Sequence, residues 1–148
     1  MRPQSIKLFE KVYLASIAIG LVEVAVGWQR LIAETLEPLA SVAEGTRQGL
    51  LIASVVLVFG ILLLLWFLVA RKASNVAKWI LVALMALGAF SILKETFDSA
   101  VSKDLGFALN AVSTLLGLYA MWLLFRPDAA AWLESKGADG PGDPETFD

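Results

Sequence analysis

The amino-acid sequence predicts an all-α, polytopic membrane protein with four transmembrane helices in an antiparallel bundle. Hydrophobic residues form 58% of the 148 residues and charged residues 18%, against about 45–50% and about 25% in ordinary domains. The hydrophobic residues fall into four blocks, and the longest, residues 49–70, contains no charged side chain. A helix of this length measures roughly 33 Å, which is enough to cross the hydrocarbon core of a bilayer. We expect helices throughout, because an isolated strand leaves its backbone unpaired in lipid.

The first two spans are predicted over residues 8–27 and 49–70. Glu23 interrupts the apolar part of the first, and no persuasive cleavage site follows it. We therefore expect an uncleaved membrane helix at this position and not a secretory signal peptide. Arg71 and Lys72 end the second span with two positive charges.

The last two spans are predicted over residues 76–93 and 105–125. Ser74 or Asn75 can cap the amino end of the third, and Asp104 can do the same for the fourth. Both spans are therefore preceded by residues that favour the start of a helix.

Two polar stretches separate or follow these spans. Residues 28–48 place apolar side chains at helical spacing, which predicts a short amphipathic helix on the membrane surface or an extension of the first span. Residues 137–148 are rich in Gly, Pro and acidic side chains, which predicts a disordered tail. Residues 1–136 are then one transmembrane domain.

Positive charges predict the orientation of the spans, because Lys and Arg accumulate on the cytoplasmic side. Eight lie on the side of the termini and four on the other, so we expect both termini in the cytoplasm. Six residues are expected to fix the inner face or to anchor it at the headgroups: Arg71, Lys72, Lys78, Trp79, Arg126 and Trp132.

Composition also removes several functions. The chain has no cysteine and no histidine, which excludes disulfides, thiolate metal sites and imidazole-ligated haem. No nucleophile with an oriented base, metal-ligand set or phosphate loop is recognisable, so we expect no catalytic residue, metal or cofactor and no enzyme. The net charge of −2 argues against nucleic-acid binding.

Three polar residues inside the spans are the candidates for function. Glu23 could be a proton or cation site, since an ionisable group within a span is expensive; alternatively it pairs with Arg30 or Arg47 near the interface. Asn110, with Ser113 three residues on, could bridge two helices or contact a substrate.

Small residues recur in three spans at helical spacing. Ser16 precedes Gly20 by four residues, Ser113 precedes Gly117 by four, and Gly88 lies in an alanine-rich segment. Such residues let backbones approach closely in lipid. This pattern favours a tight bundle, although it suits a homodimer or docking onto a larger protein equally.

Three segments resemble a family of small uncharacterised four-helix bacterial inner-membrane proteins. They are residues 5–15 (SIKLFEKVYLA), 71–79 (RKASNVAKW) and 123–132 (LLFRPDAAAW). The resemblance implies the four-helix fold and its charged inner loop, and it implies no activity or functional residues.

The first functional hypothesis is a structural or interaction role, as a homo-oligomer or as an accessory subunit that contacts the lipid bilayer and a membrane-protein partner. A second is a minimal transporter or channel component in which Glu23 and Asn110 line a polar path. A third is a lipid-sensing or membrane-homeostasis protein that uses residues 28–48.

Overall fold

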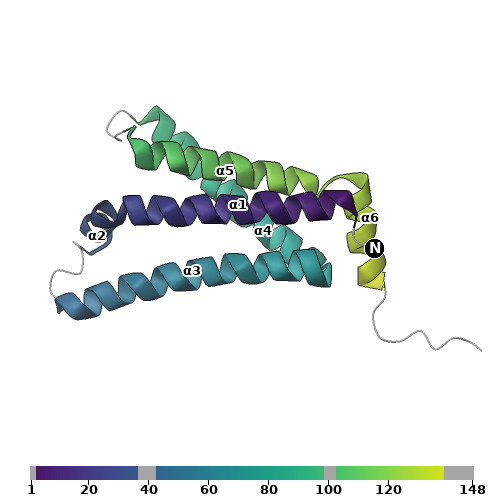
Figure 1. Cartoon of the computed structure of the whole chain (residues 1–148), viewed down its shortest axis with the longest axis horizontal. Coiled ribbons are helices and arrows are strands. Elements are labelled where there is room, and N and C mark those ends of the chain that lie inside the picture. The colour runs from purple at the N-terminus through teal and green to yellow at the C-terminus, as the bar shows by residue number, and fades with distance from the viewer. Residues whose placement is uncertain (1–2, 37–42, 99–102, 139–148) are drawn as a thin grey trace, which may run out of the picture.

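The computed structural model describes residues 3–36, 43–98 and 103–138, and helices form nearly all of them (Figure 1). The helices are α1 (Gln4–Val26), α2 (Trp28–Leu36), α3 (Glu44–Lys72), α4 (Asn75–Phe97), α5 (Leu105–Leu123) and α6 (Pro127–Ala138). No strand occurs within these ranges, which confirms the all-α class. Residues 139–148 of the predicted tail lie outside the described residues, while α6 reaches its first two positions.

Three of the helices, α3, α4 and α5, are long and apolar enough to cross a membrane, which supports a membrane protein. Helix α1 is also 23 residues long, but it is not among those three. Its sequence carries Lys7, Glu10, Lys11 and Glu23. The predicted spans 49–70 and 76–93 lie wholly within the longer helices α3 and α4.

The long helices alternate in direction, and α1 packs chiefly against α5. Helix α4 contacts α5 and α3, while α3 contacts α1 and α2. The two short helices lie at opposite ends of the bundle, with α6 and the N-terminus together at one end and α2 at the other (Figure 1). We call these the α6 end and the α2 end.

Local sequence explains where two helices begin. Ser74 is the N-cap of α4, and its hydroxyl accepts a hydrogen bond from the Ala77 backbone N–H at 3.2 Å. Asp104 caps α5 in the same way by accepting from the Phe107 N–H at 3.1 Å. Each cap satisfies one of the donors that the first turn of a helix leaves unpaired. These two starts are as predicted.

The apolar core lies toward the α6 end. Phe9 and Tyr13 of α1 are fully buried there, and their rings stack with centroids 5.4 Å apart. The Tyr13 hydroxyl donates to the Leu62 carbonyl oxygen at 3.2 Å, which ties α1 to α3. The same buried cluster includes Leu81 from α4 and Leu124, which follows α5.

Helix α6 closes this end by capping α1. The Asp128 carboxylate accepts hydrogen bonds from the Ser5 hydroxyl at 2.8 Å and from the Ser5 backbone N–H at 3.2 Å. Pro3, at the N-cap position of α1, makes no side-chain cap. Asp128 therefore satisfies a first-turn donor of α1 from the opposite end of the chain.

Helix α3 is little enclosed by the rest of the bundle. Of its 29 residues, only Leu51, Leu65, Val69 and Ala70 are buried. An ion pair of 3.6 Å between Arg71 and Glu10 adds a contact to α1 near the α6 end. Most of its apolar side chains consequently face outward, as expected for a helix surrounded by lipid.

Candidate functional site

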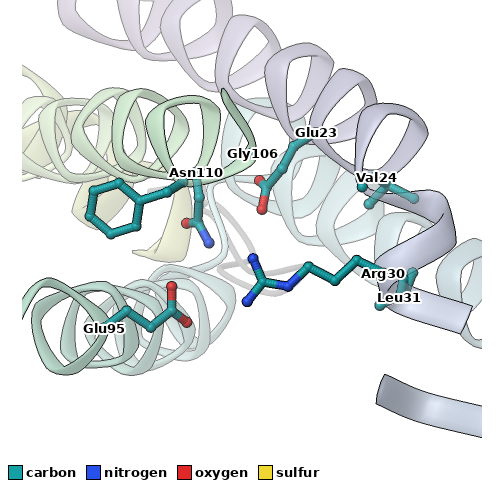
Figure 2. A pocket seen from close by; sticks show the side chains of 9 residues that line it. Glu23, Val24, Arg30, Leu31, Glu95, Gly106 and Asn110 are labelled. Carbon is teal, nitrogen blue, oxygen red and sulfur yellow. The ribbon is translucent and has the colours of Figure 1, made fainter. Parts of the chain in front are cut away.

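A polar pocket lies at the α2 end of the bundle and has a volume of about 200 Å³. Helices α1, α2, α4 and α5 all contribute to its lining (Figure 2). The polar residues are Glu23, Arg30, Glu95 and Asn110. The remaining lining residues are apolar or lack a side chain: Val24, Gly27, Leu31, Gly106 and Phe107.

Helix ends bring the polar residues together. Glu23 lies in the last turn of α1, and Glu95 lies in the last turn of α4. Asn110 lies in the second turn of α5, which begins at the same end. Because α1 and α4 run toward the α2 end and α5 runs away from it, residues that are 15 to 87 positions apart in sequence meet here.

The turn at Gly27 adds the fourth polar side chain. The Gly27 N–H donates to the Glu23 carbonyl oxygen at 2.8 Å, and the Gly27 carbonyl oxygen then accepts from Leu31 at 2.9 Å. Helix α1 thereby ends just before Gly27, and helix α2 begins directly after it. Arg30 is carried back toward the pocket, where Figure 2 shows its guanidinium between Glu23 and Glu95.

Two of the polar groups are oriented by neighbours on their own helices. The Asn110 side-chain oxygen accepts from the Thr114 hydroxyl at 3.2 Å. The Glu95 carboxylate accepts from the Ser91 hydroxyl at 3.4 Å. All four polar side chains point toward a common space in Figure 2. The pocket thus combines two carboxylates with a guanidinium and an amide.

The bundle is filled inward of this pocket. The Ser113 hydroxyl of α5 donates to the Ser16 carbonyl oxygen of α1 at 3.0 Å. A Cβ atom placed on Gly20 would lie 3.7 Å from both the Phe59 ring and the Ser113 hydroxyl, which is ordinary packing distance. The buried cluster around Tyr13 follows toward the α6 end. The polar pocket is therefore a recess at one end of the bundle.

The structure brings together two of the three candidate polar residues. Glu23 and Asn110 line the same pocket, whereas Ser113 bonds α5 to α1. Asn110 bonds within its own helix, so Ser113 makes the interhelical hydrogen bond considered for Asn110. Glu95 was not expected in the pocket, since charges near span ends are ordinary.

The small residues differ in how closely they are packed. A Cβ atom on Gly117 would lie 2.8 Å from the Met85 sulfur, so α4 and α5 approach closely at this point. Ser16 is buried, and its hydroxyl donates to the Tyr13 carbonyl oxygen at 2.8 Å. A Cβ atom on Gly88 would meet nothing within 4 Å. The Gly88 surface of α4 therefore has no close neighbour among the described residues.

The residues predicted for the inner face all lie toward the α6 end, and two of them, Lys78 and Trp79, contact the Phe125 ring. Lys78 is only 7% exposed, and its Nζ lies 4.2 Å from the centroid of the Phe125 ring. Trp79 meets the same ring edge to face, with centroids 5.9 Å apart. A cation over an aromatic face is stabilised by the ring quadrupole. Lys78 is thus packed against the Phe125 ring and largely covered by the protein.

Arg126 and Trp132 also lie at the α6 end of the bundle. The Arg126 guanidinium lies 5.6 Å from the centroid of the Trp122 ring. Trp132 belongs to the buried cluster and is 9% exposed, so it packs within the bundle. The physical reason is that α6 packs back against α1 and α4. Arg71 and Lys72 remain exposed at the end of α3.

Within the described ranges, no group of three or more acidic residues is arranged to hold a metal ion. Comparisons of the chain with protein-family models, curated proteins and solved structures found no match. The resemblance to small bacterial inner-membrane proteins therefore remains a prediction.

Proposed function

We propose that this chain is a four-span membrane protein with an interaction role, and that the pocket at the α2 end is one of its contact sites. One observation carries the proposal: the polar pocket stops at the Ser113–Ser16 bond, and apolar side chains fill the bundle beyond it. A recess that combines opposite charges is suited to holding a polar group. A conducting path would require polar side chains or water along the whole bundle.

The fourth span in this proposal is α1. Its 23 residues extend about 34 Å, and its charges lie near its ends, with residues 12–22 uncharged between them. Lys7 and Lys11 can extend toward headgroups at one end. Its close packing against α5, which is long and apolar enough to span, supports placing both at the same depth.

We propose further that the α6 end is cytoplasmic and that the bilayer is a bacterial inner membrane. Eight of the twelve Lys and Arg residues of the sequence belong to that side under this topology. The chain has no native cysteine, so single substitutions report orientation cleanly. Ser135→Cys should be labelled only after inside access is given, and Thr46→Cys should react from outside; the reverse pattern would reject the orientation.

The interaction partner in this proposal is a second copy or a larger membrane complex. Helix α3 supports it, because few of its residues are buried within the chain. Gentle nanodisc extraction followed by native mass spectrometry should show a defined oligomer or a stoichiometric complex. A chain that is monomeric across extraction conditions and carries no bound molecule would reject the interaction role.

A transporter or channel component is the second candidate, and the shared pocket position of Glu23 and Asn110 favours it. Proteoliposomes distinguish the two functions. We expect cation and proton flux no faster than through protein-free liposomes. Flux that is abolished by Glu23→Gln would favour the transporter and overturn the proposed interaction role of the pocket.

A further inference from the structure

A second recess lies on the surface of α1 at the α6 end of the bundle, and we call it the lysine recess. It is lined by Gln4, Lys7, Leu8 and Lys11 and has a volume of about 460 Å³. All four side chains are exposed. Among the described residues that form its lining, none is acidic. The two lysines therefore give the lysine recess a formal charge of +2, which suits an anionic group.

The helical repeat places these side chains on one surface. The lining residues are three or four positions apart, and residues with that spacing are neighbours on a helix. Ile6 and Phe9 lie on the opposite side of α1, where both are fully buried. Burial of that side in the bundle fixes the rotation of α1 about its own axis. Lys7 and Lys11 consequently face outward together, with Cβ atoms about 5–6 Å apart.

The carboxylates closest to the lysine recess are engaged with other partners. Glu10 forms an ion pair with Arg71 of α3 at 3.6 Å, and Asp128 accepts hydrogen bonds from the buried Ser5. Within the described parts of the chain, neither lysine of the recess takes part in an ion pair or a hydrogen bond through its side chain. Both ammonium groups can therefore contact a ligand without breaking an existing bond.

Two ammonium groups so placed can contact a single phosphate. Each supplies three N–H donors on a flexible stem, and the Gln4 amide supplies two more. A lysine contacts phosphate as a compact positive charge. A headgroup with its own ammonium would bring a further positive charge toward the two lysines, and the described lining has no carboxylate to receive it. The lysine recess therefore favours a ligand with a net negative charge.

The surface of α1 next to the lysine recess favours a lipid over a soluble phosphate. Ala15, Ala18 and Val22 continue the same exposed surface toward the α2 end, and residues 12–22 carry no charge. Acyl chains attached to a phosphate at the lysines would therefore lie beside an apolar surface. In Figure 1 the start of α1 lies at the same end as the carboxyl ends of α3 and α5, which are long and apolar enough to cross a membrane. Positive charges at this depth attract anionic headgroups.

We infer that the lysine recess binds the phosphate of a lipid with a net negative charge, held between the ammonium groups of Lys7 and Lys11. The Gln4 amide donates to the same phosphate. This site goes beyond the interaction role proposed above, which concerns the pocket at the α2 end. It requires only that the α6 end of α1 reaches a headgroup layer, in either leaflet. Phosphatidylglycerol meets these requirements, whereas phosphatidylcholine carries a positive group as well.

The test uses the full chain in nanodiscs that contain phosphatidylglycerol and phosphatidylcholine in equal amounts and with the same acyl chains. Native mass spectrometry then counts the lipids that stay bound. We expect phosphatidylglycerol to be retained over phosphatidylcholine. Lys7→Gln should lower this preference about fivefold, the effect of one lysine beside an anionic surface. Lys7→Arg should keep most of the preference, because the positive charge remains.

A matched control separates the lysine recess from general surface charge. Lys72→Gln removes the same charge from an exposed position at the α6 end, outside the lining of the recess, and it should leave the preference unchanged. Circular dichroism should show the same helix content in all variants, because the substituted side chains are exposed. Equal retention of the two lipids by the unmodified chain would overturn the inference. A preference that survives Lys7→Gln, or that falls equally in Lys72→Gln, would also overturn it.

Glycerol 3-phosphate added to the same samples distinguishes a lipid from a soluble phosphate. We expect phosphatidylglycerol to stay bound at millimolar concentrations of this competitor, because the acyl chains contribute to binding. Displacement would overturn the assignment to a lipid. The proposed function fails separately: loss of the lipid preference with the oligomer intact rejects only this inference, whereas cation flux through proteoliposomes rejects only the interaction role.

Discussion

The Ser113 hydroxyl donates to the Ser16 carbonyl oxygen at 3.0 Å, and this bond joins α5 to α1 immediately inward of the polar pocket. Both residues also begin a small-residue pair, with Gly20 following Ser16 and Gly117 following Ser113. The same short segments therefore provide a close approach of helices and the polar contact between them. Helix association in lipid depends on both features, since lipid provides no hydrophobic drive.

We predict that Ser113→Ala lowers the free energy of unfolding by about 0.6 kcal/mol, the average for an interhelical hydrogen bond in a membrane. The effect is small because the Ser16 carbonyl keeps its place in the backbone ladder of α1. Titration with a denaturing detergent measures the change. Ser54→Ala is the control: its hydroxyl bonds to Leu51 within α3 at 2.7 Å, so it should have no effect on the α1–α5 contact.

Gly117→Ala should stabilise the protein less than Gly88→Ala, although both make the same change in a helix. Alanine favours a helix over glycine by about 0.5–1 kcal/mol, and nothing opposes this gain at Gly88. At Gly117 the new Cβ atom would lie 2.8 Å from the Met85 sulfur and force that side chain to move. Detergent unfolding of both variants measures the difference, and Met85→Ala should remove it. Equal stabilities would contradict this prediction and show that Met85 moves aside without a cost in stability.

The Ser5–Asp128 contact predicts an acid-sensitive attachment of α6. The hydrogen bond from the Ser5 hydroxyl lowers the pKa of Asp128 below its usual value. A lowered pKa in the folded state adds stability above the unfolded value of about 4. That contribution disappears as the pH falls from there through the lower, folded pKa of Asp128. The protection factors of the α6 amides against hydrogen exchange should fall in this acidic window.

Ser5→Ala tests the cause of that sensitivity. Without the hydroxyl donor, we expect the pKa of Asp128 to move back toward its usual value, which carboxyl NMR titration can follow. Ser135→Ala is the matched control, because its hydroxyl bonds to Trp132 within α6 at 3.1 Å and does not contact Asp128. An identical Asp128 titration in both variants would reject the contact.

Phe125→Leu should lower the free energy of unfolding by about 0.5–2 kcal/mol through loss of the Lys78 cation–π contact. The Lys78 Nζ lies 4.2 Å from the centroid of this ring, and leucine preserves much of the apolar contact. Phe97→Leu makes the same change at a ring that is 82% exposed, so it should have little effect. If the two variants unfold alike in detergent titration, the ring does not stabilise Lys78.

Sequence reasoning predicted the parts of the fold that depend on long local patterns. The uncharged residues 49–70 identify α3, and Ser74 and Asp104 mark two helix starts by their capping chemistry. Helix ends were less predictable: α3 begins at Glu44, because a membrane helix can continue into polar sequence. Local pattern also could not show that α6 folds back, which buries Trp132.

Only part of the pocket could be predicted, because local sequence patterns do not show which helix ends meet. Glu23 and Asn110 stand out because they are polar within apolar blocks. Arg30 and Glu95 lie at the ends of such blocks, where charged residues are common and carry little information. Only the alternating direction of the helices brings them to the same end. Arg30 and Glu95 could therefore be recognised as pocket residues only from contacts between helices, which no single segment of the sequence encodes.

The Asp128 cap on α1 has a consequence for the order in which the protein can assemble. Ser5 and Asp128 are 123 positions apart, and the main packing partner of α1 is α5, the last of the long helices. During synthesis the first helix therefore emerges long before either partner exists, with its charged side chains still unpacked. Helix α1 is made before α5 and α6, and its packing is completed only after both of them have been made. A ribosome that stops before α5 leaves α1 without the neighbour and the cap that hold it in the finished bundle.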